Sequence, residues 1–280
     1  MIDFNPLDYK KKSAMNWNKV AKLYHNNWVG LGVGPFGSTK KVIELADIKK
    51  DDVILDLACG TGALSIDISK IIQNNGKIIG IDLSRNALSL AKGNVQFQNS
   101  CFIEMDMENI AFSIKFSKVL CQYGFMFLTK PSSSLLSIKN HMMRNSRIVI
   151  AVHGISKNVP YFSCIMNEIQ RYYPSIISKD SPTVHSFGDG KKLINLLKNA
   201  KFEDIQITRY VFQYTAGKFS EYWNNYINCT ANSIKEIIKK DTRKYIKIKN
   251  NARENIKQYL KNNVIVFPWE ILIITAVNKK

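Results

Sequence analysis

The sequence predicts an α/β fold in which helices cover both faces of a mostly parallel, doubly wound sheet. The apolar run 53–57 is soon followed by glycines, which is typical of a buried parallel strand. Gly60 and Gly62 follow this run, and a helical apolar pattern begins directly after them, so the chain turns tightly from strand to helix. Strand and helix patterns then alternate as far as residue 152. Such alternation indicates parallel strands joined by right-handed crossover helices.

The remaining elements are predicted from local signals. Ser84 is a good N-cap for a helix over residues 85–92, and Pro131 opens the helix after the fourth strand. Residues 30–37 contain four glycines and are predicted to form a flexible loop. The predicted strands are 53–57, 77–81, 100–104, 117–122, 147–152, 203–214 and 264–277. The other predicted helices are 14–28, 39–46, 63–71, an aromatic helix within 156–186, 190–200 and a long helical insertion over 219–261.

The first two strands define a binding site for a nucleoside that carries positive charge. Asp82 lies twenty residues past Gly62, the spacing at which dinucleotide folds place an acid on the ribose hydroxyls. However, Ser65 replaces the third glycine of the dinucleotide motif. Asp56 moreover ends the first strand, where a pyrophosphate would lie and where a carboxylate would repel it. S-adenosylmethionine has a ribose, an ammonium and a sulfonium but no phosphate, and it is the predicted cofactor.

Four segments then resemble one protein family. Residues 56–62 are similar to the first motif of class I S-adenosylmethionine-dependent methyltransferases, and Asp82 matches their acidic second motif. Residues 102–112 resemble the third motif, and residues 120–127 resemble the end of the fourth strand in a small-molecule group. That group is related to the ubiquinone and menaquinone C-methyltransferases. The resemblance covers residues 40–155 and implies a Rossmann-like seven-stranded methyltransferase fold with a terminal antiparallel hairpin and helical lid insertions.

We expect four regions along the chain. They are an N-terminal helical cap (1–47), a cofactor-binding core (48–155), a helical lid insertion (156–187), and the C-terminal part of the core (188–280) with a helical insertion at about 218–262. By the resemblance, the N-terminal helix lies over the cofactor. A core-packing helix with an aromatic face is the alternative for that segment.

The motifs assign residues to the cofactor more securely than to the reaction. The predicted cofactor-binding residues are Asp56, Ala58, Gly60, Gly62, Asp82, Leu83, Asp106, Met107, Gln122 and Tyr123. His153, just past the fifth strand, and Tyr123 are the candidate catalytic residues. A sulfonium methyl is already electrophilic, so a dedicated base is optional when the acceptor ionises readily. No residues at metal-ligand spacing are recognised.

The acceptor is expected to be a small apolar or aromatic molecule. Its predicted contacts come from the aromatic helix and the loop that follows it: Tyr161, Phe162, Ile165, Met166 and His185. The alternative for this apolar band is a core position beneath the helices of 219–261. A surplus of aromatic and methionine side chains suits a planar acceptor, and for this reason we favour the lid.

Net charge leaves two other functions open. The chain of 280 residues carries a formal charge of +18, which invites a nucleic-acid methyltransferase as an alternative. The lysines are scattered, however, and the segment after the fourth strand lacks the prolines typical of base methylation enzymes. The lysine-rich segment 235–261 is therefore predicted to be a solvated helical face. A non-catalytic cofactor-binding subunit is the second alternative.

Cysteine usage and hydropathy predict the setting of the protein. The five cysteines form no C-x-x-C pair, so we expect reduced, buried, structural thiols. The N-terminus lacks a basic–apolar signal pattern, and the longest apolar run, 264–277, is too short to span a bilayer. A cytoplasmic protein is expected. Oligomeric state is left open, with a homodimer as one option.

Overall fold

The computed structural model describes residues 4–73 and 75–279 and contains one mixed sheet. Its strand order is β3-β2-β1-β4-β5-β8-β6, with the short β7 paired to β8. The first five strands run parallel, and β8 runs antiparallel between β5 and β6. The strands are β1 (Val53–Leu57), β2 (Lys77–Asp82), β3 (Ser100–Glu104), β4 (Phe116–Gln122), β5 (Met142–His153), β6 (Glu203–Gly217), β7 (Leu260–Lys261) and β8 (Val264–Asn278). This order, with its terminal antiparallel hairpin, confirms the predicted methyltransferase fold.

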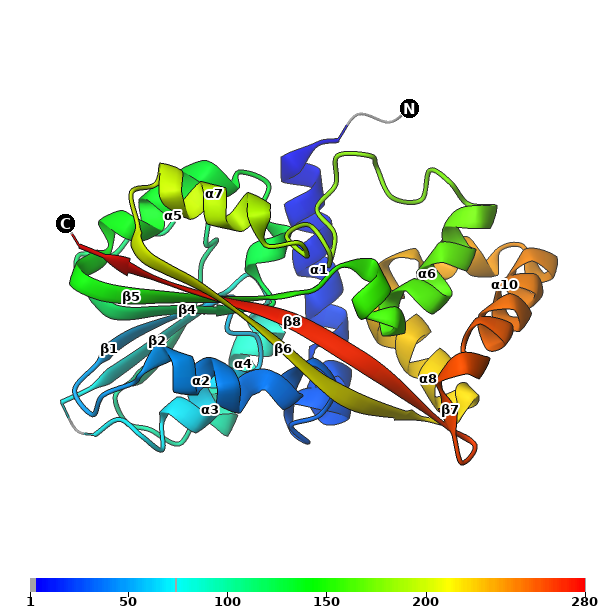
Figure 1. Ribbon diagram of the computed structural model, residues 1–280, viewed down its shortest axis with the longest axis horizontal. Helices are drawn as coiled ribbons and strands as arrows, with labels where there is room; N and C mark the ends of the chain where they lie inside the picture. Colours follow the sequence, from blue (N-terminus) through cyan, green and yellow to red (C-terminus); the bar gives the residue numbers. More distant parts are fainter. Residues whose placement is uncertain (1–3, 74, 280) are drawn as a thin grey trace.

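Helices cover both faces of the sheet, and one more helix lies across its end. In Figure 1, α2 and α3 lie below the sheet and α5 and α7 above it, while α1 crosses near the carboxyl ends of the parallel strands. The helices are α1 (Pro6–Tyr24), α2 (Thr39–Ala46), α3 (Ala63–Ile68), α4 (Arg85–Asn94), α5 (Pro131–Asn140), α6 (Pro160–Tyr172), α7 (Lys191–Asn199), α8 (Phe219–Asn225), α9 (Lys235–Lys239) and α10 (Thr242–Asn255). Shorter turns are η1 (His25–Val29), η2 (Gly34–Ser38), η3 (Phe125–Phe127), η4 (Ser156–Asn158), η5 (Tyr226–Thr230), η6 (Asn232–Ile234) and η7 (Lys257–Tyr259).

The two strands of the terminal hairpin extend well beyond the rest of the sheet. β6 and β8 each contain 15 residues, whereas β1 contains five. Their projecting ends support a helical half made of α6, α8, α9 and α10, on the right of Figure 1. The insertions 156–187 and 218–262 therefore pack together on a common strand pair. The predicted helical insertion 219–261 contains several short helices, and its last two residues form β7.

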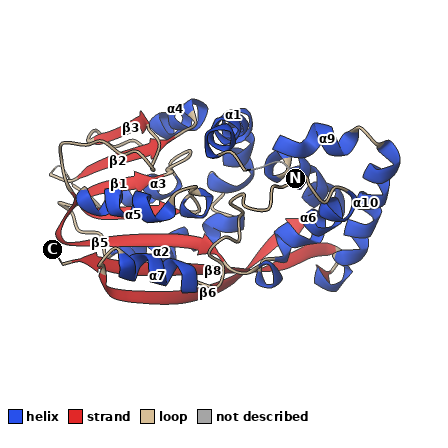
Figure 2. Cartoon of the chain, turned by 90° about the horizontal axis from the view of Figure 1, so that it is seen from above, coloured by secondary structure: helices blue, strands red, loops and turns tan. Residues whose placement is uncertain are grey.

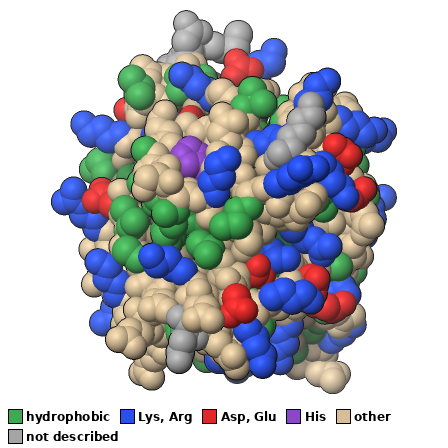
Figure 3. All heavy atoms as spheres, turned by 90° about the vertical axis from the view of Figure 1, so that its left-hand side faces the viewer, with side chains coloured by type: hydrophobic (Ala, Val, Ile, Leu, Met, Phe, Trp, Pro, Cys, Tyr) green, Lys and Arg blue, Asp and Glu red, His purple; other side chains and the backbone are tan. Residues whose placement is uncertain are grey.

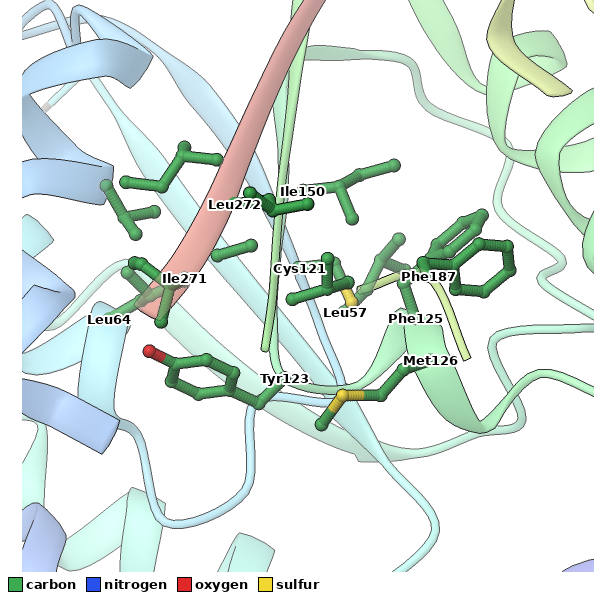
Figure 4. Close-up of a cluster of buried hydrophobic side chains, with 14 of the residues drawn as sticks. Leu57, Leu64, Cys121, Tyr123, Phe125, Met126, Ile150, Phe187, Ile271 and Leu272 are labelled. Atoms are coloured by element: carbon green, nitrogen blue, oxygen red, sulfur yellow. The ribbon is translucent and has the colours of Figure 1, made fainter. Parts of the chain in front are cut away.

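Apolar side chains of β1, β4, β5 and β8 form a core that is closed to solvent on both faces of the sheet. Figure 4 shows part of this core near the ends of β4 and β5, where Phe125 and Phe187 lie together with ring centroids 5.7 Å apart. Trp269 of β8 and Tyr161 of α6 are also fully buried. Burial on both faces explains why the parallel strands have apolar runs instead of alternating patterns.

Some boundaries differ from the prediction. α1 begins at Pro6, eight residues earlier than expected, because Asn5 caps it by accepting from the backbone N–H groups of Leu7 and Asp8. The predicted flexible loop 30–37 contains the helical turn η2, in which Gly34 and Pro35 are buried. Residues 1–3 of the predicted N-terminal cap lie outside the described residues.

Charges are mixed on the face shown in Figure 3, and the cysteines follow the prediction with one exception. Lys and Arg side chains are spread among acidic and apolar ones over the end of the molecule shown in Figure 3. Cys59, Cys121, Cys164 and Cys229 are buried and all five cysteines are free. Cys101 is exposed, so the expected burial was wrong there. It lies on β3, the edge strand, which leaves part of its surface uncovered.

Candidate active site

A cleft opens at the carboxyl ends of β1, β2 and β4, between the sheet and α1. It holds about 1130 Å³ of space not filled by atoms, including solvent at its mouth. Nine of the ten predicted cofactor-binding residues line it, and the tenth, Gly62, lies in the adjoining turn. The nine are Asp56, Ala58, Gly60, Asp82, Leu83, Asp106, Met107, Gln122 and Tyr123. Ligands of doubly wound sheets bind at this edge, so chain topology alone brings these residues together.

The turn after β1 is built for close approach of a ligand to the backbone. Ala58 and Gly60 have positive φ angles of 53° and 54°, and a side chain at Gly60 would project into open space. The backbone N–H of Gly60 donates to Asp82 Oδ2 at 2.9 Å, and that of Ser84 donates to Asp82 Oδ1 at 2.8 Å. Each carboxylate oxygen keeps a further lone pair. Asp82 is therefore held in place and can still accept hydrogen bonds from two ribose hydroxyls.

Asp56 is a buried carboxyl group at the end of β1. It is 1% exposed, and Ser65 Oγ donates to its Oδ2 at 2.7 Å. Burial raises the pKa of Asp56 to about 7, and the nearby Asp82 carboxylate adds to the rise. A cation placed beside Asp56 would relieve this desolvation penalty. Ser65, which replaces the third glycine of the dinucleotide motif, is thus a partner of the acid.

The third-motif acid is engaged by a lysine that sequence reasoning did not single out. Lys10 of α1 lies 2.7 Å from Asp106 Oδ2 and 2.5 Å from Glu108 Oε2. Burial lowers the pKa of Lys10, but its hydrogen bonds to the two acids outweigh this, and the net shift is upward. Lys10 therefore stays charged and ties α1 to the segment after β3.

Tyr123 and Gln122 form a buried polar network with η2. The hydroxyl of Tyr123 lies 2.6 Å from Ser38 Oγ and donates to the carbonyl of Pro35 at 2.7 Å, while Gln122 Nε2 donates to Ser38 Oγ at 3.1 Å. Tyr123 has a φ of 63°, a strained conformation for a residue with a side chain. The next position, Gly124, requires glycine because a Cβ there would lie 2.3 Å from Ala58 Cβ. Strained residues thus end both β1 and β4 at the cleft.

An aromatic wall closes the side of the cleft between α1 and β4. It consists of Trp17, Tyr24, Phe36 and Tyr123, all of which line the cleft. Successive ring centroids along this series are 5.2, 5.7 and 5.9 Å apart, each in an edge-to-face arrangement. The N-terminal segment therefore covers the cleft, as the resemblance implied. The aromatic residues at helical spacing in 14–28 were the signal for it.

His153 lies behind Tyr123, outside the lining of the cleft. Its ring stacks on that of Tyr123 with centroids 4.3 Å apart, and its Nδ1 accepts a hydrogen bond from Trp269 Nε1 at 3.1 Å. Burial, with a smaller contribution from His185, lowers the pKa of His153 well below its usual value. His153 is therefore neutral and positioned to support the wall.

The predicted acceptor contacts lie elsewhere, which differs from the prediction. Tyr161, Phe162 and Ile165 are buried against β8 and the helical half, and none of the five predicted residues lines the cleft. The Tyr222 hydroxyl donates a hydrogen bond to the backbone carbonyl of Tyr161. The ring of Tyr161 also contacts the rings of Trp28 and Trp269. Met166 is partly buried against the same core. His185 Nδ1 is 2.7 Å from the carbonyl of Gly154. The apolar stripe of α6 is buried, but its partners are β8 and α10.

Other candidate features are limited in the described part of the chain. A wider groove between η2, β6 and α8 contains none of the predicted site residues. Over residues 4–73 and 75–279, no group of three or more His, Cys, Asp or Glu side chains could hold a metal ion. No described helix combines the length and apolar character needed to cross a membrane.

This strand order, with a cleft at the carboxyl ends of the parallel strands, is that of class I S-adenosylmethionine-dependent methyltransferase domains. A family model described as a methyltransferase domain matches residues 48–216. The chain therefore belongs to this family, whose cofactor is S-adenosylmethionine.

Curated relatives include quinone methyltransferases, at a distance. A ubiquinone/menaquinone biosynthesis C-methyltransferase of Wigglesworthia glossinidia brevipalpis is 28% identical over 163 residues, covering 54% of this chain and 64% of the relative. A 2-phytyl-1,4-naphtoquinone methyltransferase of Nostoc is 26% identical over 141 residues, covering 48% and 61%. The matched segment thus spans less than two thirds of these relatives.

Solved structures share the fold at low sequence identity. The YcgJ protein of Bacillus subtilis superposes with a TM-score of 0.59 at 15% identity, covering 87% of this chain and 99% of that one. A phosphoethanolamine N-methyltransferase of Haemonchus contortus, in complex with phosphomonomethylethanolamine and S-adenosylhomocysteine, gives 0.59 at 13% identity, covering 100% and 61%. These likenesses concern the fold alone.

Proposed function

We propose that this protein transfers the methyl group of S-adenosylmethionine to a small apolar or aromatic acceptor bound against the aromatic wall. The observation that carries the proposal is the division of the cleft lining. Acidic and glycine residues line it after β1 and β2, and the aromatic wall (Trp17, Tyr24, Phe36, Tyr123) lines it from α1, η2 and the end of β4. A planar apolar molecule is the ligand that suits such a wall.

The ribose and methionine parts of the cofactor suit the residues on the β1 and β2 side. Asp82 would accept from the ribose hydroxyls, and the carboxylate of Asp56 would face the cationic methionine part. Leu83 and Met107 would bracket the adenine. The methyl group would then point toward Tyr123, because the acidic side of the cleft holds the charged groups.

The reaction needs orientation more than acid–base chemistry. The acceptor atom attacks the methyl carbon as the bond from that carbon to sulfur breaks, and S-adenosylhomocysteine leaves. The acceptor releases its proton to solvent, and an acceptor that ionises readily does so before the methyl group is transferred. Holding the two reactants in line can lower the barrier by roughly 7–11 kcal/mol. The network through Ser38 and Pro35 fixes Tyr123, and stacking on His153 fixes it from behind.

The named acceptors of the curated relatives support this substrate class. Those relatives methylate quinone precursors by name, and a quinol ring is planar, aromatic and readily ionised. Two observations favour a small acceptor over a nucleic acid. α1 contributes Tyr9, Trp17 and Tyr24 to the cleft lining, and none of the large apolar side chains exposed on the described residues is aromatic.

Methyl transfer from radiolabelled S-adenosylmethionine tests the proposal. We expect label in a short-chain demethylmenaquinol or a simple phenol and none in phosphoethanolamine or single-stranded RNA. Label confined to RNA would establish the nucleic-acid alternative. Tight cofactor binding without turnover on any of these probes would favour the non-catalytic alternative.

Two variants separate the aromatic wall from the α6 stripe. Phe36→Ala should raise KM for the acceptor at least about tenfold while leaving the cofactor Kd within about twofold, because it removes an apolar contact of roughly 1.5–3 kcal/mol. Met166→Ala, in the partly buried α6 stripe, is the control and should leave KM unchanged. A raised KM in Met166→Ala alone would restore the acceptor site that the sequence suggested.

A further inference from the structure

The outer surface of α1 exposes several large apolar side chains among lysines. The inner face of the same helix lines the cleft. Tyr9, Trp17 and Tyr24 on the inner face line the cleft. The flanks are held by neighbouring helices, since Asn18 bonds to Asn86 and Asn232 of η6 donates to Asn16. The remaining side is an exposed stripe, the outer stripe. It consists of Leu7, Asp8, Lys11, Lys12, Met15, Lys19, Lys22 and Leu23.

The apolar members of the outer stripe are well exposed. Leu7 is 80% exposed, Met15 52% and Leu23 38%. The loop after α1 continues this surface with Leu31 at 67% and Val33 at 36%, and both border the same groove as Leu23. Single exposed apolar residues are ordinary, but several of them distributed among lysines over the exposed side of one helix indicate an interaction surface.

Three of the four lysines in the outer stripe have no acidic partner among the described residues. Lys12 pairs with Asp8, but within residues 4–73 and 75–279 no acid lies at ion-pair distance from Lys11, Lys19 or Lys22. α9, next to η6, adds the half-exposed Ile237 with Lys239 and Lys240. Figure 2 shows α4, α1 and α9 along one side of the molecule.

We propose that the outer stripe docks on the surface of an anionic lipid bilayer. Lysines that alternate with leucine and methionine on one face of a helix match both parts of such a surface. The lysine ammonium groups contact lipid phosphates, and the apolar side chains enter the layer between headgroups and acyl chains. A second copy of this chain is disfavoured as occupant because two faces of the same positive charge repel. A nucleic acid would satisfy the lysines but leave Leu7, Met15 and Leu23 without partners.

Docking would place the cleft beside the membrane. α1 separates the outer stripe from the aromatic wall by the width of a single helix. An acceptor that partitions into the bilayer would then reach the cleft without crossing water. The docking itself does not depend on the proposed function, since vesicle binding needs neither cofactor nor acceptor.

Vesicle sedimentation tests the proposal. We expect the full-length protein to sediment with vesicles of equal parts phosphatidylcholine and phosphatidylglycerol, and not with phosphatidylcholine alone. Lys11→Gln/Lys19→Gln/Lys22→Gln should lower the partition coefficient about 100-fold, since a lysine near an anionic surface contributes about 1 kcal/mol, or roughly fivefold. Leu7→Ser/Met15→Ser/Leu23→Ser should lower it at least about tenfold.

Matched controls separate this surface from net charge and general exposure. Lys191→Gln/Lys192→Gln/Lys198→Gln removes the same charge from α7, and Leu136→Ser alters a side chain on α5 that is 52% exposed, like Met15. Both should bind vesicles as the unaltered protein does. All the substituted positions are exposed, and equal melting temperatures would verify folding.

Three results would overturn the proposal. The first is equal loss of vesicle binding in the α7 variant. The second is a concentration-dependent dimer that the Leu7→Ser/Met15→Ser/Leu23→Ser variant abolishes. The third is RNA binding that outcompetes vesicles and disappears in the Lys11→Gln/Lys19→Gln/Lys22→Gln variant.

Discussion

Burial of the Asp56 carboxyl lowers the stability of the folded protein at neutral pH. The same carboxylate is proposed to face the cationic part of the cofactor. Burial raises its pKa in the folded protein to about 7, from an ordinary aspartate value of about 3.9. Between about pH 4 and pH 7 the unfolded chain loses this proton while the folded chain retains it. Stability therefore falls as pH rises through this window and stays reduced above it.

Asp56→Asn should accordingly stabilise the free protein. Asparagine keeps an acceptor for Ser65 but carries no charge, so we expect a gain of about 2–4 kcal/mol in the free energy of unfolding at pH 8 that vanishes near pH 4. Denaturant melts at both pH values measure it. Asp67→Asn, on the surface of α3, removes the same charge and should gain nothing. Equal stability of Asp56→Asn and the unaltered protein at pH 8 would show that the carboxyl is not destabilised.

At the scale of elements, α1 borders the cleft, and Lys10 holds this helix to the segment after β3 through its ion pairs with Asp106 and Glu108. The Lys10 side chain is 19% exposed, and that of its partner Glu108 is 5% exposed, so this ion pair is less screened than a surface pair. We expect entry and exit of the cofactor to involve movement of α1, because Tyr9, Trp17 and Tyr24 of this helix line the cleft. Breaking the pair should make that movement easier.

Lys10→Met should therefore speed release of S-adenosylhomocysteine by about tenfold, or roughly 1.4 kcal/mol in the barrier. Stopped-flow fluorescence can follow release through Trp17, which lines the cleft. Lys12→Met is the control, because Lys12 pairs with Asp8 on the outer surface of the same helix. Equal release rates in both variants would contradict a fastening role for Lys10.

The different positions of α1 and α6 relative to the cleft show where sequence reasoning stops. Both helices have apolar faces with aromatic residues, and periodicity identifies which face is buried. It does not identify the partner. Tyr161 of α6 is buried by β8 and η5, and Trp17 of α1 faces the cleft. That choice depends on the 15-residue length of β6 and β8, which carries α6 away from the cleft.

At the scale of the whole molecule, the gathering of the acidic residues at one cleft could be predicted because it is encoded locally. Asp56, Asp82 and Asp106 each follow a strand recognisable from its own residues, and parallel topology brings strand ends together. Lys10 could not be found in this way. Its contact with Asp106 joins positions 96 residues apart, and a lysine in a lysine-rich chain gives no local signal.

The central claim is that this cleft binds the cofactor through Asp82. Calorimetric titration with S-adenosylmethionine tests this claim most directly. Charge-assisted hydrogen bonds contribute about 1.5–3 kcal/mol each. Asp82→Ala should therefore weaken binding roughly 100-fold, about 2.7 kcal/mol, and Asp204→Ala on the surface of β6 should leave it unchanged. An affinity of Asp82→Ala equal to that of the unaltered protein would contradict the account.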